Sequence, residues 1–390
     1  MTGQRRPTRA LLTLFLVGLA LRPQIVGVGP LLPRIQSALG ISHGVAGLLS
    51  TIPVLCMGVF APLAPPLLRR YGSRAAVGVS VVAIGAFGIL RALVPDAAAV
   101  LAFTVPVGVG IAVVGTLLPV VVKEEHPLRP ALGTGVYAAG INVGATASSF
   151  LAVPLAVVFG WRGALVAYSA ATLAFVVPWL GRPHPSAQPI ERAPLPVRVP
   201  IAWGLAGTFA LQSILFYGFN AWLADAYVDR NWSDTSAGAL IAVMNALSLA
   251  VGVATGIFGD RVASRRRFLV GGSATAVAAA SLIAANVPTA WAWTVVLGAA
   301  LGVLFTTVMT LPLDAARGRG DVAAMSTLML GAGYAIAALA PVGLGAVRDA
   351  TGSFTLPLAL LAVDAFVLLA VTATISTRRL EAAHARSIPV

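Results

Sequence analysis

One arginine, Arg22, lies near the middle of an apolar segment, 10–33, that otherwise predicts a membrane-spanning helix. Placing an arginine at the centre of a bilayer costs roughly 2.5–3.5 kcal/mol, so it needs a partner or a water-filled cavity. Its planar guanidinium group suits a carboxylate or a small linear or planar anion. We therefore expect Arg22 to attract an anionic or electron-rich substrate. The alternative is a structural arginine bonded to neighbouring carbonyl groups.

Other apolar segments carry polar and aromatic residues at a depth similar to that of Arg22. Gln212 and Phe216 are four residues apart and therefore share one face of a helix, where Tyr217 would complete an amide donor beside an aromatic wall. The predicted substrate-binding residues are Arg22, Tyr137, Asn142, Gln212, Phe216, Tyr217, Asn245 and Tyr334. For each of them the alternative is a hydrogen bond between helices or ordinary packing, both common in membrane proteins.

Acidic residues are scarce in the apolar segments, and Asp364 is the one carboxylate clearly in the middle of one. A buried carboxylate can take up a proton near neutral pH. Asp364 is therefore the candidate for proton coupling, and a structural polar contact is the alternative. The first half has no such carboxylate, which argues against an exporter of cations.

Nothing in the sequence indicates an enzyme. The single cysteine, Cys56, cannot form an intrachain disulfide. The four histidines lie in loops, the tail or a segment edge, and no HExxH, Walker or nucleophile-triad motif is present. We expect no catalytic residue, no metal and no cofactor. Without an ATP-binding domain, transport would draw on a gradient or run downhill.

Composition indicates which elements position these residues. Of the 390 residues, 58% are hydrophobic and 10% are charged, whereas soluble domains carry roughly 25% charged residues. A helix needs about 20 apolar residues to cross a bilayer. We predict an all-α membrane protein with twelve transmembrane helices, at 10–33, 43–68, 75–93, 97–122, 130–158, 163–180, 201–222, 236–259, 268–285, 290–313, 322–347 and 355–376.

The net charge of +13 also reports topology. With the N-terminus inside, 20 of the 26 Lys and Arg residues fall on the cytoplasmic side and only Arg34, Arg91, Arg162, Arg230 and Arg348 fall outside. The positive-inside rule then places both termini in the cytoplasm. Because no basic patch with aromatic residues is found, we expect no nucleic acid as a partner.

The chain divides into two similar halves. A Pro-rich polar stretch, 181–200, separates six predicted spans from six others. A shift of 193 residues lays Gly140 on Gly333, which indicates an internal repeat. We predict an N-terminal six-helix bundle (1–180), a cytoplasmic linker (181–200), a C-terminal bundle (201–380) and a cytoplasmic tail (381–390). Two repeats of one orientation are typical of transporters. The GxxxG pairs Gly140–Gly144 and Gly252–Gly256 predict either rocking contacts between the halves or tight packing.

Several motifs resemble the major facilitator superfamily. The segment GIFGDRVASRRR, 256–267, is similar to its cytoplasmic loop signature, and the loops FGWRGA (159–164) and RDATGSF (348–354) resemble further signatures. The resemblance implies a major facilitator fold of two pseudo-symmetric bundles, with Asp260, Arg261 and Arg265 in a cytoplasmic gate. The first-half copy departs from the pattern, since Pro65 stands where the aspartate is expected.

A narrower resemblance covers nearly the whole chain. The segments ALRPQIVGVGPLLPRIQSALGIS (20–42), LQSILFYGFNAWL (211–223) and GAGYAIAALAPVGLG (331–345) are similar to the cyanate and 2-nitroimidazole transporter family. This implies a secondary transporter of the cytoplasmic membrane for a small anion or a polar heteroaromatic solute. We expect alternating access, proton-coupled uptake and a monomer. The alternatives are drug or antibiotic efflux and a non-transporting receptor or sensor.

Overall fold

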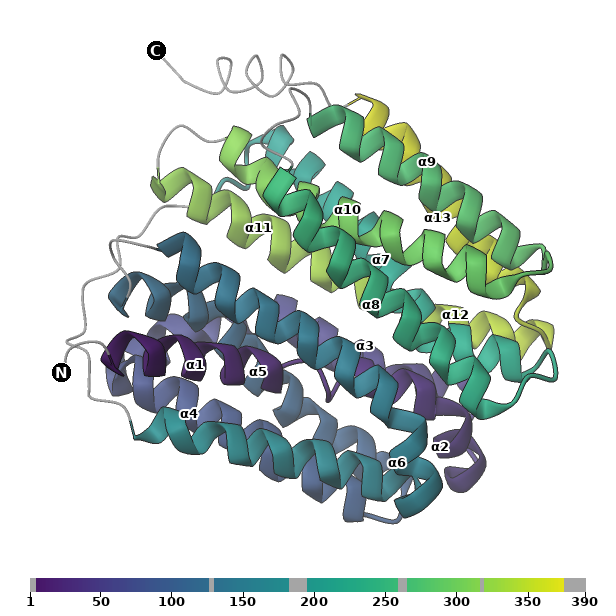
Figure 1. Cartoon of the computed structure of the whole chain (residues 1–390), viewed down its shortest axis with the longest axis horizontal. Coiled ribbons are helices and arrows are strands. Elements are labelled where there is room, and N and C mark those ends of the chain that lie inside the picture. Colours follow the sequence, from purple (N-terminus) through teal and green to yellow (C-terminus); the bar gives the residue numbers. More distant parts are fainter. Residues whose placement is uncertain (1–4, 126–129, 182–194, 259–264, 316–318, 375–390) are drawn as a thin grey trace.

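Helices make up the described part of the chain, which contains no β-strand (Figure 1). The computed structural model describes residues 5–125, 130–181, 195–258, 265–315 and 319–374. Its α-helices and 3-10 helices (η) are α1 (Arg5–Ala20), η1 (Val26–Leu31), α2 (Leu32–Leu39), α3 (His43–Val59), η2 (Ala61–Leu63), α4 (Ala64–Leu93), α5 (Ala97–Glu125), α6 (Pro130–Leu180), α7 (Pro200–Val228), α8 (Asp234–Phe258), α9 (Arg265–Ala284), α10 (Ala290–Ala315), α11 (Arg319–Ala337), α12 (Leu339–Thr351) and α13 (Thr355–Thr374).

These elements contain the twelve predicted spans. By length and composition, nine of the described helices are able to cross a membrane. One of the nine, α6, provides two passes, because its backbone leaves helical geometry at Gly160 (φ 70°). Only glycine adopts such a left-handed conformation without steric cost. The shorter apolar helices Ala10–Ala20 and His43–Val59 supply the other two spans.

The first two spans are not continuous helices, contrary to the prediction. The span 10–33 is interrupted by turns at Leu21–Ile25 and continues as η1. Pro23 lies in the interruption, and a proline inside a helix removes a hydrogen bond and clashes with the preceding turn. The span 43–68 is divided in the same way, because α3 stops at Val59 and η2 precedes α4.

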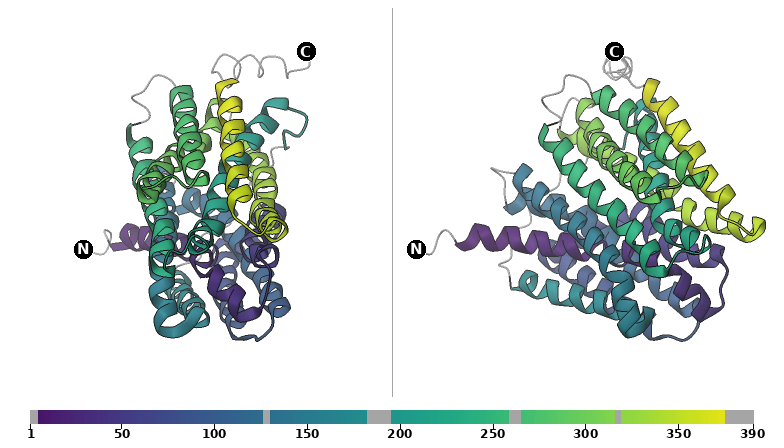
Figure 2. Two further views of the ribbon diagram at one scale, coloured as in Figure 1. Left: turned by 90° about the vertical axis from the view of Figure 1, so that its right-hand side faces the viewer. Right: turned by 45° about the vertical axis from the view of Figure 1, so that its right-hand side comes forward.

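The helices pack as two groups. The first group, α1 to α6, is joined by the packing of α1 on α6 and of α4 on α5. The second group, α7 to α13, is joined by the packing of α8 on α10, α9 on α13 and α7 on α11. The groups meet where α3 contacts α11 and α12, where α6 contacts α8, and where η1 contacts α7. Two further views keep the groups on opposite sides of this contact (Figure 2).

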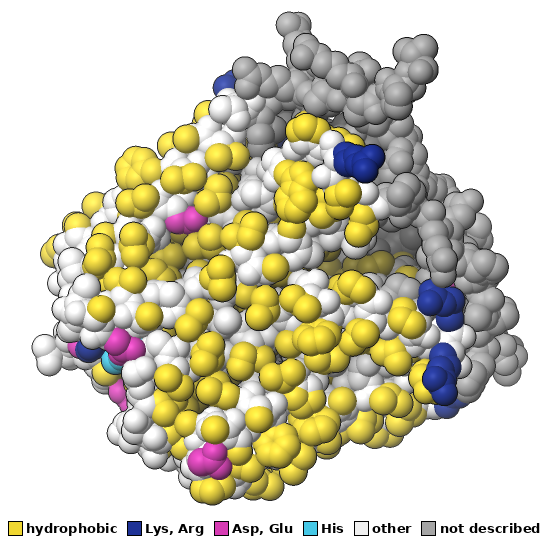
Figure 3. Space-filling model, turned by 180° about the vertical axis from the view of Figure 1, so that it is seen from behind, with side chains coloured by type: hydrophobic (Ala, Val, Ile, Leu, Met, Phe, Trp, Pro, Cys, Tyr) yellow, Lys and Arg dark blue, Asp and Glu magenta, His cyan; other side chains and the backbone are white. Residues whose placement is uncertain are grey.

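Charged side chains gather at two opposite edges of the molecule (Figure 3). Apolar side chains cover most of the face between the edges, as a membrane-embedded surface requires. Dark blue Lys and Arg side chains lie along one edge, and most acidic side chains in view lie toward the other. We refer to the second as the acidic edge. The name covers the end of α7, the start of α8 and the end of α12, where the sequence has Asp225, Asp229, Asp234 and Asp349.

The GxxxG glycines pack within the groups and not between them. A Cβ atom on Gly140 or Gly144 would collide with backbone carbonyl groups of α1, and Gly252 of α8 lies against α10. These glycines therefore serve tight packing within each group, and not contacts between the two halves. Close approach between the groups involves other glycines, among them Gly47, which faces the backbone of Pro341 and Val342 in α12.

Candidate functional site

The interruption of the first span places Arg22 between the two groups of helices. Its carbonyl oxygen accepts the backbone N–H groups of Ile25 and Val26, at 3.0 and 2.9 Å, which closes the turn after α1. Its Nη1 atom donates a hydrogen bond of 2.6 Å to the hydroxyl group of Tyr217 in α7. Arg22 remains partly exposed. Two of the predicted binding residues, Arg22 and Tyr217, are therefore in contact across the two groups.

Aromatic rings of the second group surround this guanidinium. Tyr334 of α11 lies beside Tyr217, and the ring centroids of the two tyrosines are 6.3 Å apart. Phe216 packs edge-on against Tyr217 at 5.2 Å, and Phe209 packs edge-on against Tyr334 at 4.9 Å. The site thus combines a cation from the first group with an aromatic wall from the second.

No carboxylate among the described residues pairs with Arg22. Its described side-chain hydrogen bond goes to the hydroxyl group of Tyr217. A guanidinium carries five N–H donors, and one hydroxyl group does not use them all. The site therefore retains a positive charge and free donors, which are suited to an anion or to electron-rich oxygen and nitrogen atoms.

Asn245 belongs to a second polar cluster, on α8. Its amide nitrogen donates to Ser149 Oγ of α6 at 3.0 Å and to Asn220 Oδ1 of α7 at 2.8 Å. Asn220 in turn donates to the backbone oxygen of Phe216 at 2.9 Å. These bonds tie α6, α7 and α8 together one turn away from the aromatic wall. Sequence reasoning missed Ser149 and Asn220, because nothing local identifies partners on different helices.

The remaining predicted binding residues differ in their surroundings. Tyr137 packs against the large apolar cluster that also contains Tyr217 and Tyr334. Asn142 is partly exposed and donates to the carbonyl group of Ala138 in its own helix, at 3.0 Å. Gln212 is buried and its described bond is to the neighbouring Ser213, at 3.4 Å. The described hydrogen bonds do not bring Asn142 or Gln212 to Arg22.

The proposed coupling and gating residues lie apart from this site or outside the described residues. Asp364 lies on α13, which packs on α7, α9 and α12. Its Oδ2 atom is buried and has no hydrogen-bond partner within the described residues. Asp260 and Arg261 lie outside the described residues, and Arg265 begins α9. The gating and coupling roles therefore stay predictions.

A buried arginine that the sequence assigned to the outside supports the Arg22 segment. Arg91 of α4 is 1% exposed. Its Nη2 atom donates to the backbone oxygen of Gln24 at 3.1 Å and to the Oε1 atom of Gln24 at 2.6 Å. Gln24 Nε2 donates to Ser169 of α6 at 3.0 Å. The unwound segment is thus held by α4 and α6, a connection that charge counting could not reveal.

A family model described as "Major Facilitator Superfamily" matches residues 11–338. The chain belongs to the major facilitator superfamily. The superfamily signatures noted in the sequence and the two groups of helices agree with this membership. Homologues in the superfamily are transporters and not enzymes, and this chain is a multi-pass membrane transporter of the same superfamily.

Three similar proteins extend over most of the chain. The 2-nitroimidazole transporter of Escherichia coli is 28% identical over 356 residues, which cover 88% of this chain and 89% of that protein. The cyanate transport protein CynX of E. coli is 29% identical over 371 residues, covering 93% and 96%. The uncharacterized transporter YycB of Bacillus subtilis is 29% identical over 353 residues, covering 87% of each. The narrower resemblance noted in the sequence is thereby confirmed.

Solved structures share the fold at low sequence identity. A bacterial homologue of the lysosomal transporter Spinster, in an inward-facing and unoccupied conformation, gives a TM-score of 0.71 at 17% identity and covers 99% of this chain and 95% of that one. A D-xylose-proton symporter gives a TM-score of 0.71 at 14% identity and covers 93% and 96%. The all-α major facilitator fold of this superfamily member is thus as expected.

Proposed function

We propose that this superfamily member moves a small anionic or polar heteroaromatic solute into the cell by alternating access, coupled to protons. The observation that carries the proposal is Arg22, a cation within the spans whose described side-chain hydrogen bond goes to a tyrosine hydroxyl group. The bundles 1–180 and 201–380 would move around it, since Arg22 comes from one group and Tyr217 and Tyr334 from the other.

The names of the relatives support this substrate class. Cyanate is a linear anion and 2-nitroimidazole is a planar heteroaromatic molecule with a nitro group, and each presents electron-rich atoms in a plane or a line. A guanidinium group matches such acceptors with parallel N–H donors. The tyrosine and phenylalanine rings beside Arg22 would stack on a planar solute.

The proposed orientation puts both termini in the cytoplasm and the acidic edge outside. The cations along the opposite edge support it, because positive residues accumulate on the cytoplasmic side. Asp364 is the proposed proton carrier, since its buried oxygen lacks a described partner. The fold requires no partner chain in this proposal, which treats the protein as a monomer.

The test is uptake into proteoliposomes of labelled small anions and planar heteroaromatics, with and without a pH gradient. We expect Arg22→Ala to lower the apparent affinity about tenfold to a hundredfold, because a charge-assisted hydrogen bond contributes roughly 1.5–3 kcal/mol. Arg22→Lys keeps the charge but loses the planar donors, and we expect it to recover only part of the loss.

Five outcomes would each contradict part of the proposal. Transport of an anion by Arg22→Ala at the wild-type rate and affinity would remove Arg22 from the site. An uptake rate that does not respond to the pH gradient would contradict proton coupling. An Asp364→Asn variant that responds to the gradient like the wild type would contradict the role of Asp364 as the proton carrier. Expulsion of dyes or drugs from cells would favour efflux, and no movement of any solute would favour a receptor.

A further inference from the structure

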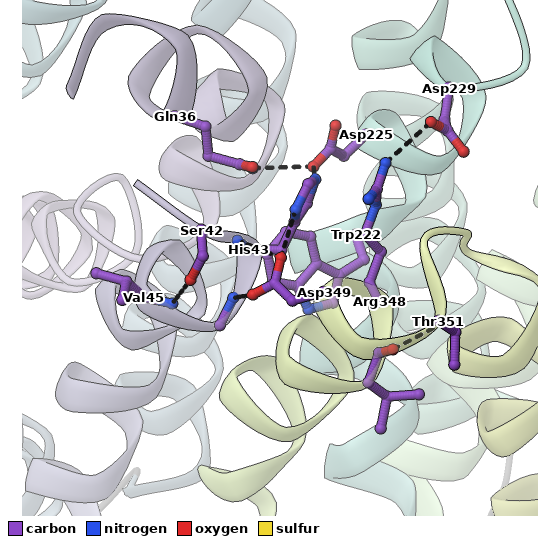
Figure 4. Close-up of polar contacts among 12 residues, drawn as sticks. Gln36, Ser42, His43, Val45, Trp222, Asp225, Asp229, Arg348, Asp349 and Thr351 are labelled. Atoms are coloured by element: carbon purple, nitrogen blue, oxygen red, sulfur yellow. Dashed lines mark hydrogen bonds and ion pairs between the residues drawn. The ribbon is translucent and has the colours of Figure 1, made fainter. Parts of the chain in front are cut away.

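A cluster of ionisable side chains joins the two groups of helices at the acidic edge (Figure 4). At its centre is His43, the first residue of α3. Its ring lies between Asp225 of α7 and Asp349 of α12, so that one group supplies the imidazole and the other supplies both carboxylates. We call these three residues the His43 cluster. They lie apart from Arg22, and none of the functions above uses them.

Both ring nitrogens of His43 face a carboxylate oxygen. Nδ1 lies 2.9 Å from Asp349 Oδ1, and Nε2 lies 3.3 Å from Asp225 Oδ2. A neutral imidazole has one N–H group, and its other nitrogen carries a lone pair that would repel a carboxylate oxygen. A proton on each ring nitrogen directs one N–H group to each carboxylate. The geometry therefore favours one proton more than a neutral histidine and two carboxylates contain.

Other donors favour the ionised form of Asp349. Its Oδ1 accepts the backbone N–H of His43 at 3.0 Å, and its Oδ2 accepts the backbone N–H of Gly44 at 2.7 Å. The carboxylate thus caps the N-terminus of α3, where a negative charge is favourable. Asp225 Oδ2 accepts the side-chain amide of Gln36 at 2.9 Å. The imidazole is the one group of the three that lies between two acceptors, and we assign the additional proton to it.

The other groups around the ring do not reverse this balance. Arg348 of α12 is the cation that opposes a charged imidazole, but it is paired with Asp229 at 3.2 Å. Helix α2 contributes the uncharged side-chain amide of Gln36, which donates to Asp225. The rings of Trp222 and Phe354 lie 5.7 and 5.5 Å from the imidazole. The nearest charges are therefore the two carboxylates.

The cluster also has access to water. The side chain of His43 is 18% exposed and that of Asp349 is 30% exposed. A proton can thus reach the ring from the aqueous phase at the acidic edge without crossing the transporter. Its entry and exit by the same edge distinguish it from a proton that is carried across the membrane.

We propose that His43, Asp225 and Asp349 form a proton-binding site that holds the acidic edge closed. Moving α3 away from α7 and α12 removes both carboxylates from the ring and leaves an ordinary histidine in water, whose pKa is about 6.5. The closed edge binds the proton more tightly than the open edge. By linkage, acid stabilises the closed edge, and this contribution is lost as the pH rises.

The proposal depends on the alternating-access part of the proposed function, because it needs an edge that opens. It does not depend on the substrate or on Arg22. In the proposed orientation the site senses external pH, so acidification outside would favour the conformation closed to the outside. Transported protons would still need another carrier.

The experiment measures the distance between nitroxide labels across the acidic edge by pulsed electron resonance. The labels are placed on Ser37→Cys of α2 and Thr355→Cys of α13, two exposed positions, in a Cys56→Ala background. The full chain is held in lipid nanodiscs without substrate, at pH values from 5.5 to 8.5. We expect the fraction with the short distance to rise on acidification.

His43→Gln retains a polar side chain but does not titrate, and we expect its distance distribution to be the same at every pH. In Asp225→Asn one carboxylate remains, and we expect the midpoint of the transition to fall by about 1 pH unit or more. His184→Gln, which removes a histidine of the predicted linker, is the matched control and should retain the wild-type midpoint.

A wild-type distribution that does not change with pH would overturn the proposal, and so would a change that persists in His43→Gln. Should His43→Gln fail to fold, an unchanged midpoint in Asp225→Asn would overturn the proposal equally. Uptake that is absent while the distance still changes with pH would contradict the substrate proposal alone. Substrate uptake with no pH-dependent distance change would contradict the His43 cluster alone.

Discussion

At the residue scale, two arginines of the first group illustrate how a cation is retained within spans. Arg22 reaches across to the Tyr217 hydroxyl group of the second group. Arg91 stays inside the first group, where Gln24 accepts two of its hydrogen bonds. Two nitrogens of Arg91, Nε and Nη1, have no partner within the described residues. Arg91 therefore depends heavily on Gln24, and the Arg22 segment depends on both.

This dependence predicts that Gln24→Leu destabilises the protein more than the double substitution Gln24→Leu/Arg91→Met. The single change removes the side-chain hydrogen bond to a buried cation, worth roughly 1.5–3 kcal/mol, and leaves the guanidinium with the backbone oxygen of residue 24 as its described acceptor. The double change removes the cation as well, and apolar replacements of buried charged groups are often tolerated. Thermal unfolding of the four proteins of the cycle measures the difference.

The control within this cycle is Arg91→Met alone, which removes the cation and keeps Gln24 bonded to Ser169. If Gln24→Leu unfolds at the same temperature as the double variant, the charge of Arg91 does not need Gln24. The support that we infer for the Arg22 segment would then have to come from elsewhere.

At the element scale, close approach of α1 to α6 sets the position of the Arg22 segment. Cβ atoms on Gly18, Gly140 and Gly144 would each meet a backbone carbonyl group of the facing helix, at Tyr137, Phe15 and Leu19 respectively. Small residues at a helix interface allow such contact in membranes. The end of α1, and with it Arg22, is therefore fixed by packing against α6.

We expect Gly144→Ala to lower the stability of the first group. The added methyl group forces α1 away from α6, and overpacking of this kind costs roughly 1–3 kcal/mol. Gly271→Ala in α9 is the matched control, because a Cβ atom there has open space around it. The melting temperature followed by tryptophan fluorescence should fall for the first variant and not for the second. Equal melting temperatures would show that the helices are less tightly packed than described.

The elements themselves were largely predictable from the sequence, whereas their partners were not. Runs of apolar residues and the polar stretch 181–200 identify the spans, because lipid imposes length and hydropathy on each helix separately. The interruption at Leu21–Ile25 was suggested only by Pro23. Which helix Gly140 packs on, and which residues bond to Asn245, follow from tertiary packing between segments distant in the chain. No local pattern encodes that information.

Two arginines on the acidic edge, where the positive-inside rule expects few cations, bond to the ends of helices. Arg162 donates to the carbonyl groups of Ala92 and Val94 at the end of α4. Arg230 donates to those of Ile283 and Ala284 at the end of α9. The last carbonyl groups of a helix lack internal partners and carry partial negative charge. These arginines therefore stabilise helix termini. The positive-inside rule by itself counts them as exceptions and gives no reason for their position.

At the scale of the whole molecule, the two groups of helices are locked together at the acidic edge. Arg34 of α2 pairs with Asp234 of α8 at 3.1 Å, in addition to the contacts of the His43 cluster. Next to the cluster, α3 lies directly against α12. Thr51 of α3 accepts the backbone N–H of Val342 at 3.2 Å. Polar contacts and close backbone packing thus favour the same closed arrangement.

Gly47 of α3 lies in this packed contact, since a Cβ atom there would meet the backbone of Pro341 and Val342. We expect Gly47→Ala to push α3 from α12 and to reduce the closed population at every pH. Because the proton binds the closed edge, a less favourable closure also lowers the apparent proton affinity. The midpoint of the nitroxide distance transition should therefore move to more acidic pH.

The control for this last prediction is Gly144→Ala, which adds the same methyl group within one group of helices. It should lower the melting temperature yet leave the pH midpoint unchanged, whereas Gly47→Ala should move the midpoint. A wild-type midpoint in Gly47→Ala would mean that closure does not depend on the contact between α3 and α12. If both variants moved the midpoint equally, the edge would be responding to general loss of stability. A midpoint that moves in Gly47→Ala and not in Gly144→Ala would show that closure of the acidic edge depends on the packing of α3 on α12 as well as on proton binding.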